Sequence, residues 1–127
     1  MSDTDESMRA LAKRFIDAIE NGEPEIAEAI YADDARIWHN NDRAVQSRAE
    51  NLKTLRAFIR GVPKRKYTER KVTPFPGGFV HQHVLVAEAA NGKSMELACC
   101  LVCTVENGRI TRLDEYLDSA PLKAWLG

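Results

Sequence analysis

The hydrophobic positions in the first half of the chain recur with the period of an α-helix. Residues 4–21 carry apolar side chains three and four positions apart, which predicts one buried helical face. This face consists of Met8, Leu11, Ala12, Phe15, Ile16 and Ile19. A shorter helix is predicted from Pro24, because proline suits a first helical turn. The sequence SRAE at 47–50 has the form of a capping box and predicts a third helix, which Gly61 and Pro63 would end.

A short strand is predicted between the second and third helices, within the sequence YADDARIWHNND at residues 31–42. An acidic pair ends the helix, residues 35–39 have strand character, and a polar loop follows. We expect this strand to carry His39 to the mouth of an apolar pocket that the rest of the chain builds. Trp38 precedes His39 directly, so we expect it to face the opposite side, against a helix or a partner subunit.

The second half of the chain changes to the two-residue period of β-strands. The segments that alternate in this way are 65–75, 79–90, 94–106 and 109–118. Turn signals of the types PGG and NG separate them, which predicts an antiparallel meander with tight hairpins. Several segments exceed the usual ~5–6 residues of a strand, so we expect a strongly curved sheet. Helices followed by such a sheet predict an α+β fold, formed by residues 1–127 as a single domain.

The hairpin loops decide which side chains face the pocket, because a one-residue change in register reverses every side chain. If the NG sequences are two-residue turns, the even-numbered positions of 94–106 share a face with His83. If the loops are residues 90–92 and 106–108, the odd-numbered positions do. The odd positions form a nearly continuous apolar face: Met95, Leu97, Cys99, Leu101, Cys103 and Val105. The three-residue loops are therefore expected, with the odd positions pointing inward.

This register predicts that Cys99 lies between His83 and Glu115 on adjacent strands. With strands ~4.8 Å apart, His83 and Glu115 would be about 10 Å from each other, a separation that suits two groups holding one small molecule. Glu115 has leucines on both sides in the inward pattern, and a carboxyl in apolar surroundings is expected to have a raised pKa. The other positions expected to contact a bound molecule are Phe15, Ile37, His81, Leu85, Leu97, Cys99, Leu101 and Leu113.

Charge and composition exclude several classes of function. The chain has 18 basic and 19 acidic residues, a formal net charge of −1, so no overall field attracts nucleic acid. We interpret the basic cluster at residues 64–71 as the solvated face of a strand. No apolar run reaches the ~20 residues of a membrane span, and the acidic N-terminus has no signal segment, so a cytoplasmic protein is expected. Cys99, Cys100 and Cys103 lack the spacing of a disulfide framework or a zinc site and are expected to be buried thiols.

The order of elements resembles that of the NTF2-like superfamily, its SnoaL-like branch in particular. The resemblance rests on YADDARIWHN after two helices, on the capped third helix and on NGRITRLDEYLD at the last hairpin, and it covers nearly the whole chain. It implies a cone in which three N-terminal helices pack on a curved antiparallel sheet around an apolar pocket, and a homodimer across the outer face of the sheet. It does not imply one reaction, because the superfamily contains isomerases, cyclases, dehydratases, epoxide hydrolases and proteins without activity.

The resemblance to ketosteroid isomerases is incomplete at the residues that carry their reaction. His39 falls where these enzymes place their catalytic aspartate. Phe15 and Leu101 fall near the positions of their oxyanion-hole tyrosine and acid, and neither side chain can donate a hydrogen bond. The chain is therefore not expected to use that mechanism.

The resemblance to limonene-epoxide hydrolases is broken at one carboxylate. Glu115 matches their second aspartate and His83 matches their arginine, but Leu85 stands at the position of their first aspartate. That chemistry needs the carboxylate pair, so it is not expected either. The polar positions that remain in the pocket are His39, His83 and Glu115.

The leading hypothesis is an enzyme that acts on a mostly apolar molecule with a carbonyl or hydroxyl group. It would be an isomerase, cyclase or dehydratase that transfers a proton without a cofactor. His39 would take the proton, while His83 and a protonated Glu115 would donate hydrogen bonds to the developing oxyanion. Each residue has a structural alternative: His39 bonded to the loop at 40–42, His83 satisfied in the core, and Glu115 paired with a buried histidine or arginine.

Two further alternatives concern metal binding and catalysis as such. His81 and His83 have a spacing that can bind zinc, but no third ligand is evident beyond Glu115 or His39, so no metal is expected. The competing hypothesis for the whole chain is a non-catalytic ligand-binding or interaction module of the same fold.

Overall fold

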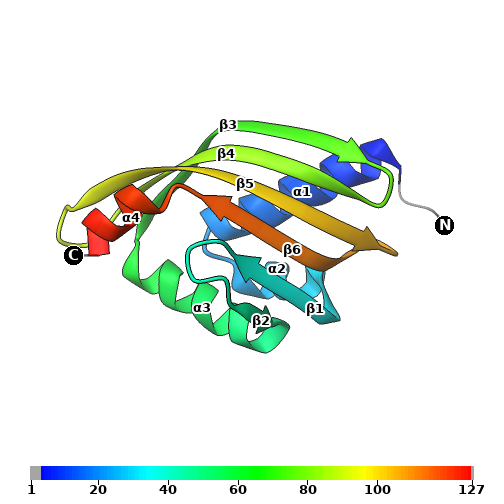
Figure 1. The fold of residues 1–127 in the computed structure, drawn as a ribbon, viewed down its shortest axis with the longest axis horizontal. Helices are drawn as coiled ribbons and strands as arrows, with labels where there is room; N and C mark the ends of the chain where they lie inside the picture. Colours follow the sequence, from blue (N-terminus) through cyan, green and yellow to red (C-terminus); the bar gives the residue numbers. More distant parts are fainter. Residues whose placement is uncertain (1–3, 127) are drawn as a thin grey trace.

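The computed structural model describes residues 4–126 of the chain. Its elements are α1 (Asp5–Glu20), α2 (Pro24–Ile30), β1 (Tyr31–His39), β2 (Val45–Ser47), α3 (Arg48–Gly61), β3 (Lys64–Phe75), β4 (Gly78–Glu88), β5 (Ser94–Glu106), β6 (Arg109–Leu117) and α4 (Ser119–Leu126). The sheet arches over α1, α2 and α3, which lie together on one side of it (Figure 1). The predicted α+β class is therefore confirmed.

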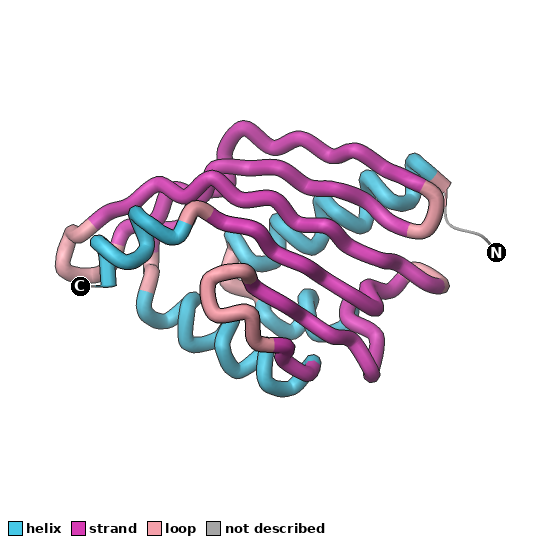
Figure 2. The backbone as a smooth tube through the Cα atoms, viewed as in Figure 1, coloured by secondary structure: helices cyan, strands magenta, loops and turns pink. Residues whose placement is uncertain are grey.

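The strands form one six-stranded sheet in the order β2-β1-β6-β5-β4-β3 (Figure 2). The meander from β3 to β6 is antiparallel, but β1 pairs with β6 in parallel. The expectation of a purely antiparallel sheet was wrong at this one pair. The connection from β1 to β6 runs through β2, α3, β3, β4 and β5, and parallel neighbours need such a long crossover rather than a hairpin.

The predicted capping box is confirmed. The Ser47 side chain accepts a hydrogen bond from the backbone N–H of Glu50 at 3.2 Å, and the Glu50 carboxylate accepts one from the N–H of Ser47 at 2.9 Å. These two bonds satisfy backbone groups that a helix start otherwise leaves open. They fix where α3 begins and thus where it passes the sheet.

The two NG hairpins differ from each other. Between β4 and β5, residues 90–92 form the predicted three-residue loop, and His83 pairs with Cys99 as expected. Between β5 and β6 the loop has only two residues, Asn107 and Gly108, both with positive φ (52° and 75°), as a tight hairpin turn requires. A bulge at Thr111 then adds one residue to β6.

This second hairpin moves the predicted pairing by two residues. Cys99 pairs with Leu117, and Glu115 pairs with Leu101 rather than with Cys99. The two-residue turn alone would have reversed β6, and the bulge reverses it again. The odd-numbered positions therefore still point inward, as predicted, although the partner of Glu115 was wrong.

Arg65 has a structural role that its place in the basic cluster did not indicate. Its guanidinium donates hydrogen bonds to the backbone carbonyls of Ile19 and Glu20 at the end of α1, at 3.0 and 3.2 Å. It also donates to the carbonyls of Ile59 and Val62 at the end of α3, at 3.2 and 2.6 Å. The interpretation of the cluster as a solvated face was wrong for this residue, which joins two helix ends to β3.

No helix within residues 4–126 is long and apolar enough to cross a membrane. Cys99 and Cys103 are buried, Cys100 is half-buried, and all three are free thiols.

Candidate functional site

A cavity of about 510 Å³ is lined by side chains from α1, α3, α4 and the inner face of the sheet. Most of the lining side chains are aliphatic or aromatic. The predicted contact residues that line it are Phe15, Ile37, Leu85, Leu97, Cys99, Leu101 and Leu113. The three predicted polar residues, His39, His83 and Glu115, line it as well. A volume of this size and an apolar lining with few polar groups are typical of small-molecule sites.

His39 and Glu115 form a direct pair in this cavity. They are register partners on the parallel strands β1 and β6, and the His39 Nε2 lies 3.0 Å from a carboxylate oxygen of Glu115. Burial of the imidazole is the largest single effect and acts to lower the pKa of His39. The hydrogen bond and charge of Glu115, together with the charge of Asp42, outweigh it and raise that pKa above its ordinary value. Glu115 therefore acts as the acceptor of a hydrogen bond from His39.

Asn40 joins the two strands that carry this pair through hydrogen bonds. Its backbone N–H donates to the carbonyl of Glu115 at 3.0 Å. Its side-chain amide donates to the carbonyl of Leu117 at 3.2 Å and accepts from the N–H of Leu117 at 2.9 Å. The side chain thus continues the β1–β6 ladder for one more residue. The His39 imidazole contacts Glu115, while only the backbone carbonyl of His39 bonds the following loop, at Arg43.

His83, Cys99 and Glu115 converge on one point of the inner face. One ligand-type atom from each, a ring nitrogen, the sulfur and a carboxylate oxygen, all lie within 4.8 Å of one another. The predicted separation of about 10 Å was therefore wrong, because it measured strand spacing and ignored how side chains on the inner side of a curved sheet lean together. Burial, with the charges of Glu115 and Cys100, raises the pKa of the Cys99 thiol to about 12.

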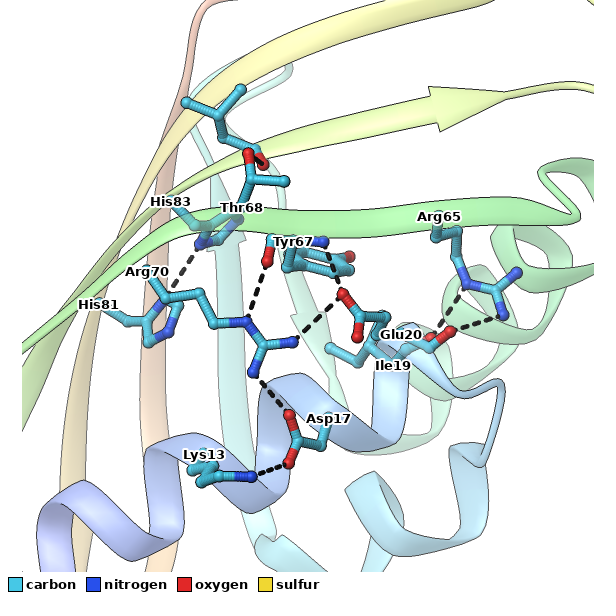
Figure 3. A network of polar contacts seen from close by, with 11 residues as sticks. Lys13, Asp17, Ile19, Glu20, Arg65, Tyr67, Thr68, Arg70, His81 and His83 are labelled. Carbon is cyan, nitrogen blue, oxygen red and sulfur yellow. Dashed lines mark hydrogen bonds and ion pairs between the residues drawn. The ribbon is translucent and has the colours of Figure 1, made fainter.

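His81 lies behind His83 and does not line the cavity, so its predicted contact with a bound molecule was wrong. Both imidazoles are buried, at 1% and 4% exposure, and their Nδ1 atoms are 3.0 Å apart (Figure 3). Burial, the neighbouring His83 and the charge of Arg70 lower the pKa of His81 to about 4. Burial also lowers the pKa of His83, against the charge of Glu115. Both rings are therefore neutral near pH 7, and the ring that carries its hydrogen on Nδ1 donates it to the Nδ1 of the other.

An ion-pair network supports this side of the cavity from α1. The Arg70 guanidinium contacts Asp17 at 2.6 Å and Glu20 at 3.2 Å, and Glu20 accepts a hydrogen bond from the backbone N–H of Tyr67 at 2.7 Å (Figure 3). The Tyr67 ring packs edge-on against His83, with ring centroids 4.9 Å apart. The network thereby holds Tyr67 and His83 in place.

Sequence reasoning missed four polar residues of the cavity: Tyr31, Asn51, Thr54 and Tyr67. The Tyr31 hydroxyl donates to the Asn51 side chain at 2.8 Å, and this pair is buried. Tyr67 pairs with Leu85 across β3 and β4, so the inward parity of Leu85 could have identified it. No pattern in the sequence indicated Asn51, a single amide on the inner face of a helix.

The fold is similar to that of NTF2-like proteins of known structure. The chain aligns with an NTF2-like protein from Burkholderia xenovorans LB400 at a TM-score of 0.82, with 15% identity over 98% of both chains. It aligns with an LEH-like epoxide hydrolase of M. tuberculosis at 0.79, with 18% identity over 97% of this chain and 90% of that one. A protein with a ketosteroid isomerase-like fold from Catenulispora acidiphila DSM 44928 aligns at 0.80, with 11% identity over 91% and 90%.

The chain belongs to the SnoaL-like domain family, whose sequence profile matches residues 12–113. The predicted resemblance is thereby confirmed. No curated protein sequence matches the chain. The solved structures are similar in fold alone, since their identities to this chain are low.

Proposed function

We propose that this SnoaL-like domain, spanning residues 1–127, binds a small, mostly apolar molecule with a carbonyl or hydroxyl group and transfers a proton on it without a cofactor. The reaction class is that of an isomerase, cyclase or dehydratase. The observation that carries the proposal is the convergence of His39, His83 and Glu115 in one part of a cavity that is otherwise largely apolar.

In this mechanism the His39 imidazole takes a proton from carbon or oxygen of the bound molecule. Glu115 holds the ring through the 3.0 Å hydrogen bond and stabilises the imidazolium that forms. A carboxylate that accepts from His39 cannot also donate to an oxyanion. The role expected for a protonated Glu115 therefore passes to His83, whose Nε2–H is available when His81 donates to its Nδ1.

Proton exchange with solvent tests this mechanism without knowledge of the product. Cyclic ketones such as α-tetralone are incubated with the protein in D₂O, binding is followed by ligand-observed NMR, and deuterium incorporation next to the carbonyl is followed by mass spectrometry. His39→Gln and Glu115→Gln should retain binding and lose most of the exchange. Asp114→Asn is the matched control, since Asp114 lies on the same strand and faces the other side.

Leu101→Trp should abolish binding, because the larger ring occupies the cavity that Leu101 lines. If exchange continues unchanged in both His39→Gln and Glu115→Gln, the proposed mechanism is wrong. Tight binding of ketones without exchange would instead identify the competing function, a non-catalytic ligand-binding module. The cavity of about 510 Å³ favours a bound molecule in either case.

The proposal includes a homodimer across the outer face of the sheet in the cytoplasm. Support comes from Trp38 and Tyr116, whose rings pack at 5.2 Å on that face, and from the exposure of Tyr116 (48%) and Val45 (50%). The three free thiols suit a reducing compartment. Equilibrium sedimentation that detects only monomer at micromolar concentration would rule the dimer out.

A further inference from the structure

The point where β4, β5 and β6 meet the cavity brings together an imidazole, a thiol and a carboxyl. His83 and Cys99 are direct cross-strand partners, and Glu115 comes from the next strand. Their ligand atoms lie within 4.8 Å of one another. His83 and Cys99 are only 4% and 8% exposed, so this is a cluster inside the protein and not a group of surface acids.

These donor types are the ones that zinc prefers in proteins. Zn²⁺ binds cysteine sulfur, histidine nitrogen and carboxylate oxygen at about 2.0–2.3 Å in a tetrahedron, which places the ligand atoms about 3.5 Å apart. The cluster must contract by about 1 Å, a movement within reach of rotation about side-chain bonds. Because the three residues come from adjacent strands of one sheet, the backbone fixes their relative positions, and only the side chains have to move.

Groups behind the cluster are placed as in protein zinc sites, where the ligands are themselves held by hydrogen bonds. The His39 Nε2 bonds a carboxylate oxygen of Glu115 at 3.0 Å. The Nδ1 of His81 lies 3.0 Å from the Nδ1 of His83. When His83 donates from Nδ1 to His81, its Nε2 carries a lone pair that can coordinate a metal.

We propose that His83, Cys99 and Glu115 bind one zinc ion, with the fourth coordination position open to the cavity. On binding, the S–H bond of Cys99 breaks, the sulfur bonds to zinc, and the proton leaves to solvent. The open position accepts water or an oxygen of the bound molecule, as in catalytic rather than structural zinc sites.

The zinc site goes beyond the proposed proton transfer and does not depend on it. Coordination needs the tautomer of His83 with hydrogen on Nδ1, whereas the proposed oxyanion donor needs hydrogen on Nε2. Zinc should therefore inhibit the deuterium exchange described above. Metal binding is measured by spectroscopy, so its failure and the failure of the exchange reaction are separate results.

Cobalt titration of the full-length, chelator-treated protein tests the site. We expect one Co²⁺ per chain, with the intense ultraviolet charge-transfer band of a cobalt–thiolate bond and the visible bands of a tetrahedral ion, both displaced by one equivalent of Zn²⁺. Cys99→Ser should abolish the thiolate band. Cys100→Ser is the matched control and should retain it, because Cys100 is the next residue on the same strand and faces the other side.

Glu115→Gln should weaken Co²⁺ binding at least 10-fold. X-ray absorption at the zinc edge of the wild-type protein gives a readout that does not depend on folding of a variant, and it should show one sulfur with nitrogen and oxygen ligands. A thiolate band that survives in Cys99→Ser or disappears in Cys100→Ser, a zinc spectrum without sulfur, or no stoichiometric binding would each overturn the proposal.

Discussion

Replacing Glu115 by glutamine tests the His39–Glu115 pair, because glutamine keeps the shape of the side chain and removes its charge. In the wild-type protein Glu115 is the main reason why the pKa of His39 is raised. Both side chains are largely shielded, at 23% and 20% exposure, so solvent weakens the interaction only in part. A hydrogen bond to a charged group contributes about 1.5–3 kcal/mol, which corresponds to about a 10- to 100-fold change in the protonation constant of His39.

The expected result is that the pKa shift of His39 changes sign. Burial, which acts to lower the pKa of His39, is opposed in the variant only by the charge of Asp42. The pKa of His39 should therefore move from above the ordinary histidine value to below it in Glu115→Gln. Heteronuclear NMR of the imidazole resonances between pH 4 and pH 9 measures both values. Single histidine variants assign the signals of the three rings.

Asp114→Asn is the control for this titration, since it removes a carboxylate one position away on the opposite face. It should leave the pKa of His39 where it is. The reasoning about the pair is refuted if His39 titrates below its ordinary value in the wild-type protein, or if the Glu115→Gln and Asp114→Asn proteins titrate alike.

The same pair predicts a pH dependence of stability. A raised folded-state pKa means that the stabilisation is fully present below about pH 6.5, the ordinary histidine value, and is lost as pH rises through the folded-state pKa. Urea denaturation should show wild-type stability declining across that window. In Glu115→Gln this decline should disappear or reverse.

Three further substitutions test the parts of the fold that position the site. Arg65→Ala should lower the free energy of unfolding by about 2–4 kcal/mol, since a charged donor to four helix-end carbonyls is lost. Lys66 is exposed, so Lys66→Ala should change this free energy by under about 0.5 kcal/mol. Urea titrations measure both values. Gly78→Ala should lower the free energy of unfolding by more than about 4 kcal/mol or prevent folding, because its Cβ would lie 2.0 Å from the carbonyl oxygen of Cys103. Gly61→Ala is the control. Its Cβ meets no atom within 4 Å, so it should be neutral or stabilising in thermal melts. Asn40→Ala should lower the free energy of unfolding by about 1–2 kcal/mol and raise the rate of amide exchange at Leu117, measured by hydrogen-exchange mass spectrometry. An unchanged exchange rate would contradict the role of Asn40 in joining β1 to β6.

Periodicity predicted most of the fold because it depends on local physics. The helical stripe of α1, the capping box at Ser47 and the two-residue alternation of the long strands are each determined by residues close together in the sequence. The parallel pairing of β1 with β6 was not predictable in this way. It involves two segments more than 70 residues apart, and no hairpin turn joins them that would indicate their relative direction.

The candidate site was predicted in composition but not in geometry. Inward parity was correct for His83 and Cys99 because the loop at residues 90–92 has the predicted length. It was correct for Glu115 because the turn and the bulge in the last hairpin cancel each other. The direct contact of His39 with Glu115 could not be seen, since it needs the β1–β6 register. His81 shares the inward face with His83 but lies two residues earlier on β4, outside the cavity, and alternation does not distinguish these two positions.

The polar groups of the cavity that could take part in a reaction come from the sheet, and most of the apolar surface that would contact a bound molecule on the other side comes from the helices. The sheet supplies His39, His83, Cys99 and Glu115, and backbone hydrogen bonds between neighbouring strands fix their spacing. The helices supply mainly apolar lining, such as Phe15 of α1 and residues of α3. Helices can shift on a sheet by small amounts without breaking hydrogen bonds between strands. Substitutions on α1 and α3 should therefore change which molecules the cavity binds. Substitutions of the polar residues of the sheet should instead change the reaction of the bound molecule.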